Sequence, residues 1–192
     1  MQVIVQWHKT NFIGDFMKIT LSILAYDDMK DLFVFELENR SYFEKMVPSR
    51  GEDYYDFTMF KKKNSMLLDE QAQKLSYFYL LKDELGHIVG RINLTDIDKD
   101  QQLGHIGYRV GEKHIGQGIA NKALQLLLAN VSHHGIYQIA AKTTTNNIAS
   151  QKVLEKNGFT YTGTSSEEFT MHGQNVQFVY YRWGDSEAIF NE

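Results

Sequence analysis

The sequence predicts a mixed α/β domain of the α+β class. Segments of strand length alternate along the chain with segments whose apolar residues recur at helical spacing. Over residues 103–133 an apolar strand, a glycine-rich turn and a helix follow one another without a break. Because no internal repeat, low-complexity tract or linker interrupts the pattern, we expect one domain over residues 17–184 and a tail at 185–192.

The first half of the chain predicts strands at both ends and helices between them. The expected elements are a strand over 17–24, helices over 27–40 and 52–74, and strands over 76–82 and 87–96. Asp27 is a favourable N-cap residue, and Leu32 and Phe35 belong to an apolar series with helical spacing. The turn Asp83-Glu84-Leu85-Gly86 joins the last two strands.

The second half alternates strands with helices. The expected elements are a strand over 103–110, a helix over 117–133, a strand over 137–142, a helix that begins at Asn147, and two final strands. Asn147 suits a helix cap because its side-chain oxygen can accept from an unpaired N–H group of the first turn. Gly158 is expected to end that helix.

Residues 1–16 stand apart, because the predicted domain begins at a second methionine, Met17. The sequence leaves three interpretations of this extension open. It is an upstream start, an artefact of cloning, or a native extra strand.

Composition narrows the class of protein. The chain has 192 residues, of which 43% are hydrophobic, so it can bury a core without disulfides or metals. It contains no cysteine, which removes thiol nucleophiles, iron–sulfur clusters and thiolate zinc sites. A net charge of −4 argues against a nucleic-acid binder. Since no apolar run reaches membrane-span length and no cleavable leader opens the chain, we expect a cytoplasmic protein.

Several conspicuous clusters have structural interpretations. Lys61-Lys62-Lys63 is interpreted as a solvated helix end, and His133-His134 as the end of another helix. Adjacent histidines point in different directions on a helix, so we expect no metal site. Tyr54, Tyr55 and Phe57 are interpreted as packing residues, with an acceptor pocket as the alternative.

The segment from Tyr108 to Ala120 has the construction of an anion site. Glycine permits close backbone approach, and the unpaired N–H groups of a helix's first turn favour phosphate, so a diphosphate is the expected ligand. The segment is not a P-loop, because no Lys, Ser or Thr directly follows Gly118. It also departs from a dinucleotide fingerprint, since Asn121 stands at the third small position.

Gly116-Gln117-Gly118-Ile119-Ala120 resembles the pyrophosphate loop of the GCN5-related N-acetyltransferases (GNAT). That loop is described as Arg or Gln, two residues, Gly, one residue, then Gly or Ala. Ile115 stands in place of the Arg or Gln, as a bulky apolar residue often does in the ribosomal-protein N-terminal acetyltransferases. The segment 147–159 resembles the family's second signature, which is Asn, two residues, Ser, and a helix ending in Lys-x-Gly-Phe.

The resemblance covers about residues 17–184 and implies the GNAT fold, a central, mostly antiparallel sheet of about seven strands, splayed in the middle and flanked by helices. It implies acetyl-CoA as co-substrate and no metal. It also implies that backbone N–H groups bind the pantetheine arm, with the Val110 N–H group stabilising the oxyanion. The implied cofactor-binding residues are Tyr108, Arg109, Val110, Lys113, Ile115, Gly116, Gln117, Gly118, Ile119, Ala120, Asn121 and Asn147.

Thioester aminolysis also needs a group that accepts a proton from the amine and one that returns a proton to the thiolate. By resemblance, Ser150 is the hydroxyl that protonates the CoA thiolate; the alternative is a helix-start serine that bonds the backbone. Glu168 lies near the position of the subgroup's general base. The alternatives are its neighbour Glu167 and a solvated pair without a catalytic role.

The resemblance therefore implies an acetyltransferase that acts on an α-amino terminus, that of a ribosomal or other protein. An α-amine has a reference pKa of about 8 against about 10.4 for lysine, so more of it is nucleophilic at neutral pH. A small-molecule amine, such as an antibiotic or polyamine, and a non-catalytic acyl-CoA-binding domain are the alternatives. The implied partners are acetyl-CoA and the amine acceptor, with no direct nucleic-acid or membrane contact. The protein is expected to be a monomer or homodimer.

Overall fold

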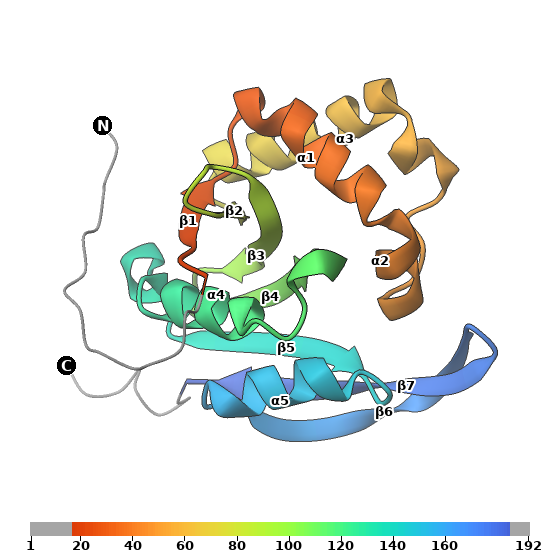
Figure 1. Ribbon diagram of the computed structural model, residues 1–192. Helices are drawn as coiled ribbons and strands as arrows, with labels where there is room; N and C mark the ends of the chain where they lie inside the picture. Colours follow the sequence, from red (N-terminus) through yellow and green to blue (C-terminus); the bar gives the residue numbers. More distant parts are fainter. Residues whose placement is uncertain (1–16, 185–192) are drawn as a thin grey trace.

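The computed structural model describes residues 17–184 and confirms the predicted fold class, a mixed α/β domain with seven strands in one sheet (Figure 1). The expectations for 1–16 and for the tail 185–192 lie outside the described residues. The strands are β1 (Thr20–Ile23), β2 (Tyr77–Lys82), β3 (Ile88–Asp98), β4 (Leu103–Val110), β5 (Gln138–Thr144), β6 (Thr160–Met171) and β7 (Gln174–Trp183). The helices are α1 (Met29–Glu38), α2 (Arg40–Met46), α3 (Phe57–Ala72), α4 (Ile119–Leu128) and α5 (Ile148–Lys156).

The sheet has the order β1-β2-β3-β4-β5-β7-β6, and its central pair, β4 and β5, is parallel while the other pairs are antiparallel. β4 pairs with β5 only from Leu103 to Ile106. Beyond this point β4 stays paired with β3 as far as Val110, whereas β5 stays paired with β7 as far as Thr144. The two central strands therefore separate, as the predicted splayed sheet requires.

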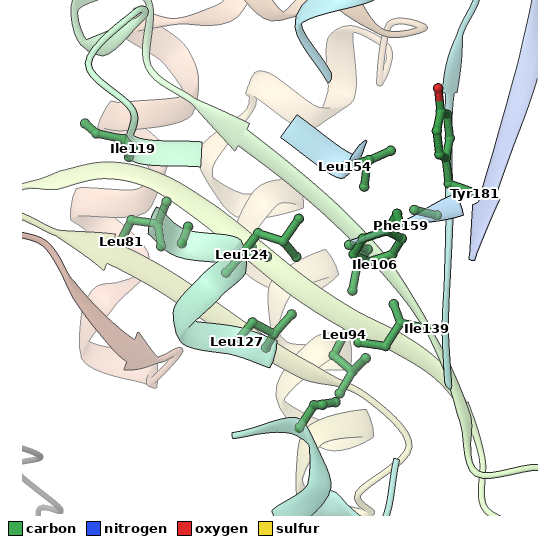
Figure 2. Packing of buried hydrophobic residues seen from close by; sticks show 14 of the residues in the cluster. Leu81, Leu94, Ile106, Ile119, Leu124, Leu127, Ile139, Leu154, Phe159 and Tyr181 are labelled. Carbon is green, nitrogen blue, oxygen red and sulfur yellow. The ribbon is translucent and has the colours of Figure 1, made fainter. Parts of the chain in front are cut away.

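Each face of the sheet is covered by its own helices and its own apolar core. On one face, Leu124 and Leu127 of α4 and Leu154 of α5 pack with strand residues such as Ile106 and Ile139 (Figure 2). The opposite core joins α1, α2 and α3 to β2 through residues that include Leu32, Phe43, Phe60, Phe78 and Leu80. In β2, Phe78 and Leu80 belong to the second core and Leu81 to the first, which is the alternation expected of a strand buried on both faces.

The helix expected over 27–40 corresponds to α1, and a separate helix that was not predicted, α2, follows it. Asn39 has φ −100° and ψ 5°, and α2 begins directly after it. Its Nδ2 donates to the Phe35 carbonyl at 2.8 Å, while its Oδ1 accepts from the Glu112 N–H group at 2.8 Å. The expected Asp27 cap was also wrong, because Asp28 supplies the carboxylate that accepts from the Ala25 N–H group at 2.9 Å.

Two other helix predictions need correction. The Lys61-Lys62-Lys63 run is exposed as expected but lies in the first half of α3 rather than at a helix end. The helix expected over 117–133 ends at Leu128 and is followed by a 3-10 turn, Val131–His134, that contains both histidines. Three more 3-10 turns occupy Tyr26–Asp28, Glu52–Tyr55 and Glu112–His114. Within residues 17–184, no helix combines the length and apolar character needed to cross a membrane.

Candidate active site

The glycine-rich loop leads from the end of β4 into α4. Gly116 and Gly118 have φ values of 76° and 74°, in the left-handed region that favours glycine. Gly118 is the N-cap of α4, and its carbonyl accepts the N–H group of Lys122 at 3.0 Å. The N–H groups of Ile119, Ala120 and Asn121 thus precede the first helical hydrogen bond of this type and form the positive end of α4. The helix starts two residues later than the predicted Gln117.

The loop is held by a hydrogen bond to the 3-10 turn before it, Glu112–His114. Gln117 Nε2 donates to the Lys113 carbonyl at 3.0 Å. Ile115 is half exposed, and a Cβ placed on Gly116 would meet no atom within 4 Å, so the loop surface is open. An open loop with unpaired N–H groups fits an anionic ligand.

The gap between β4 and β5 exposes backbone groups of β4. The Gly111 N–H group donates to the Val89 carbonyl of the β3 edge at 2.9 Å. Because N–H direction alternates along a strand, Arg109 also directs its N–H toward β3, while Tyr108 and Val110 direct theirs toward the gap. The predicted oxyanion donor, the Val110 N–H group, therefore has the required direction.

Tyr108 brings the splayed strand into contact with α5. Its hydroxyl lies 3.1 Å from Ser150 Oγ and 3.3 Å from the Ser150 carbonyl oxygen. Burial raises the pKa of Tyr108 to about 12, an effect that its hydrogen bond to Ser150 opposes. Asn147 caps the helix as predicted, because its Oδ1 accepts from the Ser150 N–H group at 3.1 Å. Among the described side chains, Ser150 Oγ has Tyr108 as its partner rather than a backbone group.

Arg109 does not join this cluster. Its side chain lies on the opposite face of β4, where Nη1 is 2.9 Å from Glu36 Oε2 and the guanidinium is 4.8 Å from the centre of the Phe43 ring. Arg91 contacts the other oxygen of the same carboxylate at 3.1 Å. Neither the side chain nor the N–H group of Arg109 is directed into the gap, so the geometry does not support its implied cofactor role. Strand alternation is the physical reason.

The α1–α2 junction contacts the segment after β4, and the β6–β7 turn contacts α2. Asn39 at the α1–α2 junction binds the Glu112 N–H group directly after β4, and a Cβ on Gly111 would lie 3.1 Å from the Phe35 ring. His172 in the turn between β6 and β7 contacts the Glu44 carbonyl of α2. Figure 1 shows this turn extending from the sheet on the same side as α2. Tyr54 is buried in the core, as expected for a packing residue.

A cavity of about 590 Å³ adjoins the point where β4 and β5 separate. Its lining side chains on the sheet face opposite α4 include Asn93, His105, Lys142, Tyr180 and Arg182. Two of these are cationic, and Asp96 is the carboxylate in the lining. The Asn93 Oδ1 atom is buried and has no hydrogen-bond partner among the described residues.

The two candidate bases lie on β6, the edge strand that β7 separates from β5, and both are exposed. Glu168 pairs with Gln177 of β7, whose carbonyl accepts the Thr145 N–H group at 2.9 Å. The Glu168 backbone therefore lies two strand spacings, or about 10 Å, from Thr145. Thr145 lies shortly before Asn147, the cap of α5. Glu167 lies in the irregular segment between the Thr164 and Glu168 pairs. Within residues 17–184, no cluster of three or more His, Cys, Asp or Glu residues could hold a metal.

Two named acetyltransferases are similar to this chain in sequence. The chain is 26% identical over 153 residues to the probable N-acetyltransferase YjcK of Bacillus subtilis, covering 78% of this chain and 84% of that protein. It is 25% identical over 173 residues to the ribosomal-protein-serine acetyltransferase of Escherichia coli, covering 88% and 94%.

Solved structures share the fold at lower identity. The ribosomal-protein-S5-alanine acetyltransferase from Vibrio fischeri has a TM-score of 0.81 at 18% identity, over 93% of this chain and 98% of that one. The spermidine N-acetyltransferase from Vibrio cholerae, solved with CoA and spermine, has a TM-score of 0.72 at 16% identity, over 88% and 96%. The family described as the acetyltransferase (GNAT) domain matches residues 18–160, which include the splayed strands, the glycine loop and α5. This chain belongs to that family and is an acetyl-CoA-dependent acyltransferase.

Proposed function

We propose that the protein transfers the acetyl group of acetyl-CoA to the α-amino group at the N-terminus of a protein, with a ribosomal protein as the favoured class of acceptor. The observation that carries the choice of acceptor is the charge of the cavity beside the gap, where Lys142 and Arg182 accompany one carboxylate, Asp96. The similarity to the ribosomal-protein acetyltransferases supports the same choice.

The cofactor residues fit acetyl-CoA. The diphosphate binds the N–H groups of the loop and of the first turn of α4, from Gly116 to Asn121, and the left-handed Gly118 orients them. Lys113 and Ile115 lie in the connection from β4 to this loop. The pantetheine arm follows the open edge of β4 and meets the N–H groups of Tyr108 and Val110, while Asn147 anchors the start of α5. Backbone direction and helix polarity support these assignments.

The reaction needs no covalent enzyme intermediate. The amine nitrogen attacks the thioester carbon, and the Val110 N–H group stabilises the oxyanion. When the tetrahedral intermediate collapses, the C–S bond breaks and its electron pair stays on sulfur. Ser150 gives its hydroxyl proton to sulfur and regains a proton from water. An acceptor that arrives as an ammonium first gives a proton to Glu168 and becomes the nucleophilic amine. After attack the nitrogen loses one further proton to water, which balances the proton that Ser150 gives to sulfur.

A polyamine is a less suitable acceptor for this cavity. Spermidine carries several positive charges and would approach Lys142 and Arg182, where like charges repel. An α-amino group carries at most one positive charge, and its pKa of about 8 leaves a useful fraction deprotonated at neutral pH.

Acetyl transfer can be measured as release of the CoA thiol, with the product identified by mass spectrometry. The acceptors should include peptides that begin with Ser or Ala, the same peptides with blocked N-termini but a free lysine, and spermidine. We expect the free α-amino peptides to react at least about tenfold faster, by kcat/KM, than the other acceptors. A faster reaction with spermidine would reject the protein acceptor and leave the acetyltransferase activity intact.

A further inference from the structure

The Tyr108 hydroxyl has two oxygen neighbours and one proton. Ser150 Oγ lies at 3.1 Å and the Ser150 carbonyl oxygen at 3.3 Å. The carbonyl is inside α5, where the N–H group of Leu154, four residues later, is its regular helical donor. Ser150 Oγ has no such helical partner. The phenol therefore stabilises the pair more by donating to Ser150 Oγ than by donating to the Ser150 carbonyl, which already accepts a helical hydrogen bond.

The direction of this hydrogen bond decides what Ser150 can do. If Ser150 donates to Tyr108, its only proton points at the phenol and away from any sulfur in the gap. If Tyr108 donates to Ser150, the phenol fills an acceptor position on Oγ and leaves the serine proton free. Burial raises the pKa of Tyr108 to about 12, so the phenol keeps its proton at neutral pH and remains a donor.

We propose that Tyr108 is the positioning residue for Ser150, donating to Ser150 Oγ so that the serine proton is directed at the departing CoA sulfur. This inference rests on the proposed function, because it assigns a partner to the proton donor of that reaction. As the C–S bond of the thioester breaks, the serine proton forms the S–H bond of CoA. Tyr108 keeps its own proton throughout and stabilises the negative charge that develops on Ser150 Oγ as the serine proton moves to sulfur.

Two backbone features hold this pair in place. Ser150 is fixed by the Asn147 cap on its N–H group, at 3.1 Å. Tyr108 is fixed by its antiparallel pairing with Ile92, even though β5 has separated from β4 at this level. The splay therefore opens space for the cofactor without loosening the strand that carries the phenol.

The test is a double-mutant cycle with Tyr108→Phe, Ser150→Ala and the double variant. Tyr181→Phe is a matched control, because its hydroxyl donates to Glu155 Oε1 of the same helix at 2.9 Å and its pKa is likewise raised by burial to about 12. We expect Tyr108→Phe to lower kcat about tenfold, as loss of one useful hydrogen bond predicts, with little change in the KM for acetyl-CoA. In the Ser150→Ala background the same change should have no further effect. The control should keep the wild-type kcat.

Three kinetic results would overturn the proposal. They are an unchanged or faster kcat for Tyr108→Phe, an equal loss in both Ser150 backgrounds, and a silent Ser150→Ala variant. If the wild type acetylates no amine, the proposed function fails. A titration of the thiol of bound CoA still tests whether Tyr108 positions Ser150. The thiol pKa, followed by thiolate absorbance, should rise in Tyr108→Phe as in Ser150→Ala, because both remove a directed donor from the thiolate. An unchanged thiol pKa in Tyr108→Phe would reject the positioning role.

Discussion

Glu167 and Glu168 are neighbours on β6, yet their backbones have different surroundings. Glu168 is held in register with Gln177, whereas Glu167 lies where the register with β7 shifts. The backbone position of Glu168 is thus fixed relative to β7 and, through it, to the end of β5. A general base must lie at a defined distance from the amine, so Glu168 is the better candidate.

We expect Glu168→Gln to lower kcat/KM for an α-amino acceptor most strongly at neutral pH and progressively less above about pH 8, where the free amine loses its proton unaided. Glu167→Gln is the matched control and should be nearly silent. The measurement is the pH profile of kcat/KM for both variants. The reverse pattern would assign the base to Glu167, and two silent variants would leave catalysis to positioning alone.

Tyr108 and Arg109 show which part of the site the sequence could predict. The motif located both residues beside the glycine loop, and that location is correct. Which N–H groups point into the gap depends on which edge of β4 faces β5, and this follows from the strand order rather than from the local motif. Glu36, the partner of Arg109, is 73 residues away in the sequence, so no local pattern could predict the pair.

At the scale of elements, the glycine loop and α4 act as one anion-binding unit. Gly118→Asp places a carboxylate at the positive end of α4, where phosphate is expected to bind. We expect affinity for acetyl-CoA to fall at least tenfold, or about 1.4 kcal/mol, when measured by calorimetry. Gly135→Asp is the matched control, because Gly135 has nearly the same left-handed φ of 72° and ends the 3-10 turn after α4. Equal affinity in the two folded variants would contradict the phosphate assignment.

The predictability of elements follows the range of the interactions that define them. The start of α5 was predicted from Asn147 because a cap is a local interaction between a side chain and the next turn. The helix α2 was missed, and the side chain of Asn39 directly before it bonds the Glu112 N–H group, which is distant in sequence. The seven strands were predicted from periodicity. The separation of the central strands was expected only from the family resemblance, and the parallel pairing of β4 and β5 was not predicted.

At the scale of the whole molecule, one buried carboxylate connects helix α1 to two central strands of the sheet. Glu36 of α1 is fully buried and binds Arg91 of β3 and Arg109 of β4. Burial raises the pKa of Glu36, but the charges of Arg109 and Arg91 outweigh that effect and the pKa is lowered overall. The carboxylate is therefore charged at neutral pH and holds α1 against the strand that borders the active site.

Glu36→Gln should lower the free energy of unfolding by about 3–5 kcal/mol, because it leaves two guanidinium groups without their buried counter-charge. Glu52→Gln, which removes an exposed partner of Arg40, should change stability little.

The lowered pKa of Glu36 also fixes the sign of the pH dependence of stability. The Glu36 contribution is fully present above the ordinary carboxyl pKa of 4.5 and is lost as pH falls through the lower folded-state value. Urea unfolding across pH 3 to 7 should therefore show a loss of stability on the acid side in the wild type that is smaller in Glu36→Gln. If the two proteins lose stability in parallel as the pH falls, Glu36 is not the group that links acid unfolding to the integrity of the active-site strand.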